Sequence, residues 1–275
     1  MGFSAPMRNR LLSGLACLLA ASCGDDGGEP VEIRIAGMVG SEAFTCGATY
    51  SGLGTAGVDL TPTDFRMYVH DVRLVTEDGD EVRVELDDDG MWQNGEVALL
   101  DFENGCGDMG TPETNDTLRG TAPPGPYTGI RFRVGVPESL NHADPTAAGT
   151  PLNLTALWWN WNGGYKFIRL EGNSSTFDGW RLHLGSTMCE GDMMGNATCN
   201  TANRPDVALD GFDPTASGLV VDLAELVATS AIDDTGEQPG CMSNPMDADC
   251  AALFDSLGLP FGGSSPTGQR VFRAP

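Results

Sequence analysis

The chain has 275 residues and is strongly acidic, with 39 Asp and Glu against 15 Lys and Arg and a net charge of −24 at pH 7. Such a surface repels nucleic acid and anionic membranes, so neither is expected as a partner. It is compatible with a solvated exported protein, with a cationic partner or with attraction of metal cations.

The N-terminus is typical of a secretory signal. Arg8 and Arg10 precede a short apolar run from Leu11 to Ala21, which is too short for a permanent membrane span. The run ends in AASC, which resembles a bacterial lipobox with Cys23 as the lipidated residue. We therefore expect a signal peptide over 1–22, a flexible tether over 23–30 and a single domain over 31–275. The predicted location is the periplasm or the outer membrane, with a lipid anchor as the sole membrane attachment. Cleavage and release without lipidation is the alternative.

Short alternating segments dominate the mature sequence. Apolar and polar residues alternate over 31–35, 65–74, 81–86 and 130–136, with arginine or acid on the expected solvent face. Further strands are expected over 180–184 and 218–223, and a strand pair over 152–161 and 166–170 around Asn162-Gly163-Gly164. One short helix is expected over 251–257. The pattern predicts an all-β fold of sandwich-like antiparallel sheets, with long disulfide-tied loops and few short helices.

Six cysteines follow Cys23, an even number that indicates disulfides in an exported chain. Spacing favours the short loops Cys189–Cys199 and Cys241–Cys250, which leaves Cys46 to pair with Cys106. No C-x-x-C pair is present, so a thiolate zinc site or thioredoxin-like redox pair is not expected, and no C-x-x-C-H motif provides a haem attachment.

Histidine is scarce and tryptophan is clustered. The three histidines are His70, His142 and His183, and imidazole is a preferred ligand of copper and zinc. Four of the five tryptophans lie at positions 158, 159, 161 and 180. Taken singly, each histidine is more simply a core or surface residue, and the tryptophans are more simply strand packing.

A series of strings resembles one family when taken in order. They are FRMYVHDVRL, WQNGEVALLDFENGC, YTGIRFRVGVPESLNH, WWNWNGGYKFIRL, WRLHLGSTMC, CNTANRPDVALDGFDP and a final LGLP. The family is the MbnP-like group, also called metallo-mystery pair four-Cys motif proteins, found near methanobactin operons and elsewhere. The resemblance implies an exported copper-binding protein that is not itself an enzyme. It pairs with a di-haem cytochrome c peroxidase-like protein, which oxidises a tryptophan to kynurenine in or beside the copper site.

Residue by residue, the resemblance implies His70, His142 and His183 as copper ligands. Trp159 and Trp161 are the principal candidates for oxidation, with Trp180 as a third. The family's four cysteines best match Cys46, Cys106, Cys189 and Cys199.

The alternative is an extracytoplasmic lipoprotein module that binds carbohydrate or calcium, with the tryptophans as a stacking face. Burial separates the two hypotheses. Histidines that meet within about 5 Å beside a tryptophan would favour copper, because metal–imidazole bonds are about 2 Å long. Tryptophans lying flat on an open surface would favour sugar binding.

Overall fold

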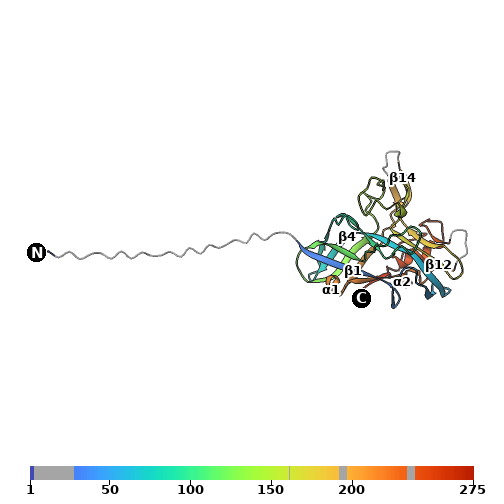
Figure 1. The fold of residues 1–275 in the computed structure, drawn as a ribbon, viewed down its shortest axis with the longest axis horizontal. Coiled ribbons are helices and arrows are strands. Elements are labelled where there is room, and N and C mark those ends of the chain that lie inside the picture. Colours follow the sequence, from blue (N-terminus) through green and yellow to red (C-terminus); the bar gives the residue numbers. More distant parts are fainter. Residues whose placement is uncertain (3–27, 161, 192–196, 234–238) are drawn as a thin grey trace.

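The computed structural model describes residues 1–2, 28–160, 162–191, 197–233 and 239–275 (Figure 1). Residues 3–22 of the predicted signal peptide, Cys23 and Trp161 lie outside these residues. Within the described ranges, no helix is long and apolar enough to cross a membrane.

The strand β4 (Val58–Thr76) is the centre of a nine-stranded sheet. It has alternating apolar residues, and it is long enough for several shorter strands to pair with different parts of it. They are β3 (Tyr50–Leu53), β5 (Glu81–Arg83), β7 (Val97–Asp101), β9 (Tyr127–Val134) and β12 (Ile168–Ser174). The sheet continues through β13 (Trp180–Leu184) and β18 (Gly240–Cys241) on one side and β16 (Asp206–Asp210) on the other.

A six-stranded sheet is built on β1 (Glu29–Val39). Its other strands are β2 (Glu42–Ala43), β6 (Glu85–Leu86), β8 (Thr117–Ala122), β17 (Leu219–Asp222) and β19 (Phe272–Arg273). Side chains of both sheets belong to one hydrophobic cluster, and the rings of Phe132 on β9 and Phe272 on β19 lie 5.2 Å apart. The all-β prediction is confirmed. Two pairs, β1–β17 and β13–β18, are parallel, which alternation within single strands could not reveal.

The remaining elements are short. The helices are α1 (Pro214–Ser217), α2 (Leu223–Val227) and α3 (Cys250–Ser256), with a 3₁₀ turn at Thr155–Leu157. The hairpin β10 (Trp158–Asn160) with β11 (Gly164–Tyr165) forms its own two-stranded sheet, as does β14 (Thr187–Gly191) with β15 (Ala197–Thr201). The expected pairing of 152–161 with 166–170 is therefore wrong in part, because residues 168–174 pair with β4 and β13 instead.

Among the residues that the structure describes, three disulfide bonds tie the loops. They join Cys46 to Cys106, Cys189 to Cys199 and Cys241 to Cys250, the pairing that the spacing favoured.

Candidate metal and tryptophan site

Two strands meet along one edge of β4 at Tyr68. Its carbonyl oxygen accepts a hydrogen bond from the Gly135 N–H at 2.7 Å, and its own N–H donates to the Phe167 carbonyl at 2.9 Å. Here β9 ends and the chain that leads into β12 arrives. The loop 135–144 and the β10–β11 hairpin leave the sheet at this junction, so it gathers segments that are distant in sequence.

His70 lies two residues beyond Tyr68 on the same face of β4. Its side chain is buried, and its Nδ1 lies 2.8 Å from the Gly135 carbonyl oxygen. Because a carbonyl only accepts, Nδ1 carries the hydrogen and Nε2 carries the lone pair. Burial lowers the pKa of His70 to about 4, so the imidazole is neutral near pH 7. A neutral imidazole held through its other nitrogen is the usual state of a metal-ligating histidine.

A hollow of about 330 Å³ lies beside His70. Its lining has both signs of charge, from Asp71, Glu96 and Glu138 and from Arg83, Arg133 and Arg204. The Arg204 guanidinium donates to the Val136 carbonyl at 2.7 Å and stacks on Phe167 at 4.9 Å.

His142 lies half-buried on the loop 135–144. Its Nε2 lies 3.1 Å from Asn141 Nδ2 and 3.4 Å from Cys199 Sγ. Asn141 Oδ1 accepts from the Tyr165 N–H, so the Asn141 nitrogen is the donor toward His142. The lone pair of His142 is therefore on Nε2, on the side of the Cys189–Cys199 bridge.

His183 is buried on β13, and its Nε2 lies 2.6 Å from Glu171 Oε1. Burial lowers the pKa of His183, with Glu171 acting in the opposite direction. The neutral ring therefore donates from Nε2 and keeps its lone pair on Nδ1. That Nδ1 is buried and has no hydrogen-bond partner among the described residues.

The three imidazoles do not converge. His183 on β13 pairs with Arg169 on β12, and Arg169 pairs with Arg66 on β4, so His183 lies two strands away from β4. Its position along the sheet is that of Arg66, which precedes His70 by four residues. With strands about 4.8 Å apart and about 3.4 Å per residue, the two Cα atoms are roughly 17 Å apart. Among the described residues, the one group of three potential ligands within 4.8 Å of one another is His142 with Cys189 and Cys199.

The described tryptophans do not form an open stacking face. Trp180 is 1% exposed, and Trp158 and Trp159 are half-buried with buried Nε1 atoms that lack a partner among the described residues. The Trp159 ring lies directly on Gly185, where an added Cβ would be 2.8 Å from Trp159 Cη2. This arrangement does not favour sugar stacking.

The acidic turns have structural roles. Asp89 Oδ1 accepts hydrogen bonds from the backbone N–H groups of Met91, Trp92 and Gln93. Asp213 caps α1 in the same way. These carboxylates complete turns and a helix start, which does not favour the calcium hypothesis.

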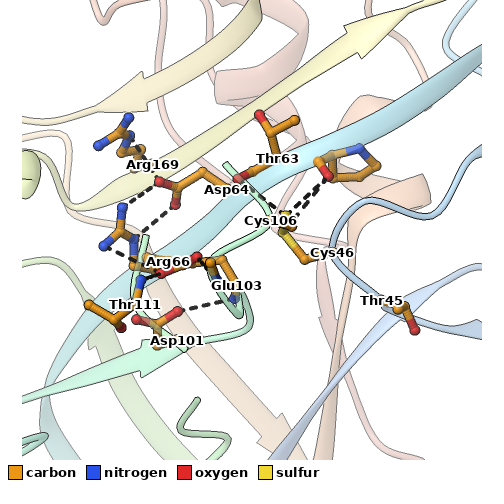
Figure 2. Close-up of a disulfide and its surroundings, with 12 residues drawn as sticks. Thr45, Cys46, Thr63, Asp64, Arg66, Asp101, Glu103, Cys106, Thr111 and Arg169 are labelled. Carbon is orange, nitrogen blue, oxygen red and sulfur yellow. Dashed lines mark hydrogen bonds and ion pairs between the residues drawn. A yellow bond between two sulfur atoms is a disulfide. The ribbon is translucent and has the colours of Figure 1, made fainter. Parts of the chain in front are cut away.

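Sequence reasoning missed a buried chain of charges on the β4 face that carries His70 (Figure 2). Asp64 contacts both Arg66 and Arg169, Arg66 reaches Glu103 at 3.8 Å, and Arg169 reaches Glu171 at 2.9 Å. The expectation that arginine on β4 faces solvent is wrong, because Arg66 is 1% exposed. The sequence contains a signal for these ion pairs in the patterns Asp-x-Arg at Asp64 and Arg66 and Arg-x-Glu at Arg169 and Glu171, because residues i and i+2 of a strand lie on the same face.

Asp101 lies at the end of this chain, next to Arg66 in the sheet. Its Oδ1 accepts from the Glu103 N–H at 3.1 Å, and its buried Oδ2 has no partner among the described residues. Burial raises the pKa of Asp101 to about 8, and neighbouring Arg66 offsets this only in part. The carboxyl is therefore largely protonated at pH 7.

The fold and the junction define a class of protein: a disulfide-tied β-sandwich with His70 where β9 and β12 meet on β4, His142 on the adjoining loop, and Trp158 and Trp159 on the β10–β11 hairpin. The sequence matches the MbnP family model over residues 28–243, and the chain belongs to the MbnP family. The structure is similar to that of MbnP from Methylosinus trichosporium, with a TM-score of 0.78 and 30% sequence identity over 89% of this chain and 97% of that one. Among curated proteins, none matches the sequence.

Proposed function

We propose that this chain is an exported copper-binding protein, and not an enzyme. We further propose that a di-haem cytochrome c peroxidase-like partner oxidises one of its tryptophans to kynurenine. The observation that carries the proposal is membership of the MbnP family over most of the chain. Bound copper would supply a redox-active cation.

Among the candidate copper ligands, His70 fits the requirements best. Its imidazole is neutral, the Gly135 carbonyl fixes its orientation, and its Nε2 keeps the lone pair. His142 and His183 remain candidates, and each keeps one nitrogen lone pair. Because the three histidines lie in different surroundings, separate variants distinguish them.

Copper titration tests the ligand assignment. We expect His70→Gln to weaken copper binding by about 10- to 100-fold or more. Replacing a residue that only supports a metal ligand already lowers metal affinity by about that factor. His142→Gln and His183→Gln give the contribution of the other two, and circular dichroism shows whether each variant is folded. Unchanged copper affinity in all three variants would refute the assignment.

Kynurenine formation cleaves the C2–C3 bond of the indole and adds two oxygen atoms, a four-electron oxidation. Water then removes the formyl group as formate. The net change is the gain of one oxygen and the loss of one carbon. The sequence has no haem attachment motif, so the partner must supply the oxidant.

Of the two candidates that the structure describes, Trp159 is preferred over Trp180, because Trp159 is half-buried whereas Trp180 is 1% exposed. Mass spectrometry after co-expression with the partner should find the mass change in the peptide that holds Trp159 and Trp161. Trp159→Phe and Trp161→Phe then identify the modified residue. Modification at Trp180 alone would contradict the target assignment.

Export is tested through Cys23. Labelling with a fatty-acid precursor and membrane fractionation should show a lipid-bearing wild type. Cys23→Ser should be unlabelled and should leave the membrane fraction. An unlabelled wild type in the soluble periplasmic fraction would instead show cleavage and release.

A further inference from the structure

The β14–β15 hairpin projects from the body of the protein (Figure 1). Cys189 and Cys199 face each other directly across its two strands and are joined by a disulfide. The hairpin forms its own two-stranded sheet, so neither main sheet holds this pair in place. The bridge therefore lies on a peripheral element, where a change at sulfur leaves the main sheets intact.

Exposure sets this bridge apart from the other two. Both cysteines of this bridge are half-buried, whereas Cys241 and Cys250 are 0% exposed, and in Cys46–Cys106 only Cys106 is half-buried while Cys46 is 8% exposed. Thiol–disulfide exchange requires a thiolate to approach a sulfur atom, so access governs which bridge is reduced. A dithiol in solution should therefore reduce Cys189–Cys199 first.

A third ligand-bearing side chain already stands beside this bridge. His142 Nε2, which carries the lone pair, lies 3.4 Å from Cys199 Sγ. The potential ligand atoms of His142, Cys189 and Cys199 all lie within 4.8 Å of one another. Metal–sulfur bonds of about 2.3 Å and metal–nitrogen bonds of about 2.0 Å place ligands of a three-coordinate ion roughly 3.7 to 4 Å apart. The two sulfurs need only separate across the hairpin for the three atoms to reach this spacing.

We propose that reduction of the Cys189–Cys199 bridge creates a metal site in which two thiolates and the His142 imidazole hold a thiophilic cation. Cu(I) matches this donor set best, because thiolate selects soft ions and imidazole also suits copper. The bridged sulfurs carry no thiolate charge, so the site does not bind the metal while the disulfide is intact. The site does not use His70.

The chemistry balances with a dithiol as reductant. The dithiol gives up two electrons and two protons and becomes a disulfide, while Cys189 and Cys199 become thiols. On metal binding both thiols lose their protons, and His142 binds as the neutral imidazole. Binding of Cu(I) therefore releases protons, and the affinity rises with pH.

The inference does not rest on the proposed function, because it requires neither kynurenine nor His70. His142 is common to both proposals, so the test relies on variants that separate them. His70→Gln removes the best candidate ligand of the proposed copper function and leaves the hairpin unchanged. The double variant Cys189→Ser with Cys199→Ser removes the thiolates and leaves His70 unchanged.

The experiment is an anaerobic titration of the exported protein with Cu(I) against a chromophoric chelator, before and after mild reduction. The reductant is removed first, and alkylation with mass spectrometry shows that Cys189 and Cys199 are the free thiols. We expect reduction to add a further bound Cu(I), with thiolate-to-metal charge-transfer absorption in the near ultraviolet. His70→Gln should keep this reduction-dependent copper, and the double serine variant should lose it.

His142→Gln should weaken the reduction-dependent Cu(I) by at least about 10-fold without preventing reduction of the bridge. Circular dichroism of each variant confirms the fold. The proposal is overturned if the reduced wild type binds no more Cu(I) than the oxidised form, or if the double serine variant keeps the additional ion. Loss of copper from oxidised His70→Gln bears on the proposed function alone.

Discussion

The protonated carboxyl of Asp101 gives a sharp prediction for stability. In the unfolded chain an aspartate ionises near pH 4, whereas burial raises the pKa of Asp101 to about 8 in the fold. Between these values the folded state binds a proton that the unfolded state releases. The contribution of Asp101 to stability therefore falls as pH rises from about 4 to about 8, and it is constant outside that window.

Asp101→Asn replaces this carboxyl with a neutral group of the same shape. Each pH unit inside the window corresponds to about 1 kcal/mol, so the variant should be more stable than wild type by about 1–2 kcal/mol at pH 5. The gain should reach about 4 kcal/mol at pH 7 and level off near pH 8. The amide oxygen of the introduced asparagine can still accept from the Glu103 N–H, which keeps the local turn.

Urea unfolding of the disulfide-intact protein at pH 5, 7 and 9 measures these differences, with the slope of each transition showing whether the unfolded states are comparable. Asp108→Asn is the matched control, because Asp108 is exposed in the same segment and its replacement should change the stability by less than about 0.5 kcal/mol. A destabilised Asp101→Asn variant at pH 7, or a pH dependence equal to that of wild type, would refute the reasoning.

Gly185→Ala should destabilise the protein by about 1–3 kcal/mol and lower the kynurenine yield, because its Cβ would push against the Trp159 ring. Gly149→Ala meets open space and should stay within about 1 kcal/mol of wild type in thermal unfolding. Arg66→Met should cost about 3–5 kcal/mol in urea unfolding, because it leaves buried carboxylates without their cation. Replacing both cysteines of Cys46–Cys106 with serine should lower the free energy of unfolding by about 4 kcal/mol, and the same change at Cys189–Cys199 should lower it by roughly 3 kcal/mol. The first loss is larger because that bridge spans 60 residues and the second spans 10. Equal costs for the two bridges, measured by urea unfolding, would contradict the loop-length argument.

Local patterns predicted much of the fold. The alternating run 65–74 lies inside β4, the run 130–136 overlaps β9, and the helix expected over 251–257 is α3 at Cys250–Ser256. Each of these depends on the period of side chains within one segment, which sequence displays directly. The partners of a strand depend on the whole chain. This is why the strand expected over 166–170 was given the wrong neighbour, and why the parallel strands were not foreseen.

The candidate site was predicted less well for the same reason. The sequence indicated which residues carry metal-binding chemistry. It did not indicate that His183 lies two strands away from β4, where its side chain contacts Glu171. The burial of Arg66 also depends on what covers that face of β4. The contact between His142 and Cys199 joins positions 57 residues apart, and no local pattern relates them.

The many partners of β4 have a consequence for synthesis. The strand is complete once residue 76 has emerged, but pairing with β9 and β12 awaits residues as late as 174. Until then a nascent chain carries a long apolar strand with unsatisfied edges, the kind of segment that invites intermolecular pairing. The charges of Asp64, Arg66, Asp71 and Arg73 interrupt that strand and act as gatekeepers during this interval. We therefore expect the residues that later form buried or surface ion pairs to limit aggregation of the growing chain before its partner strands exist.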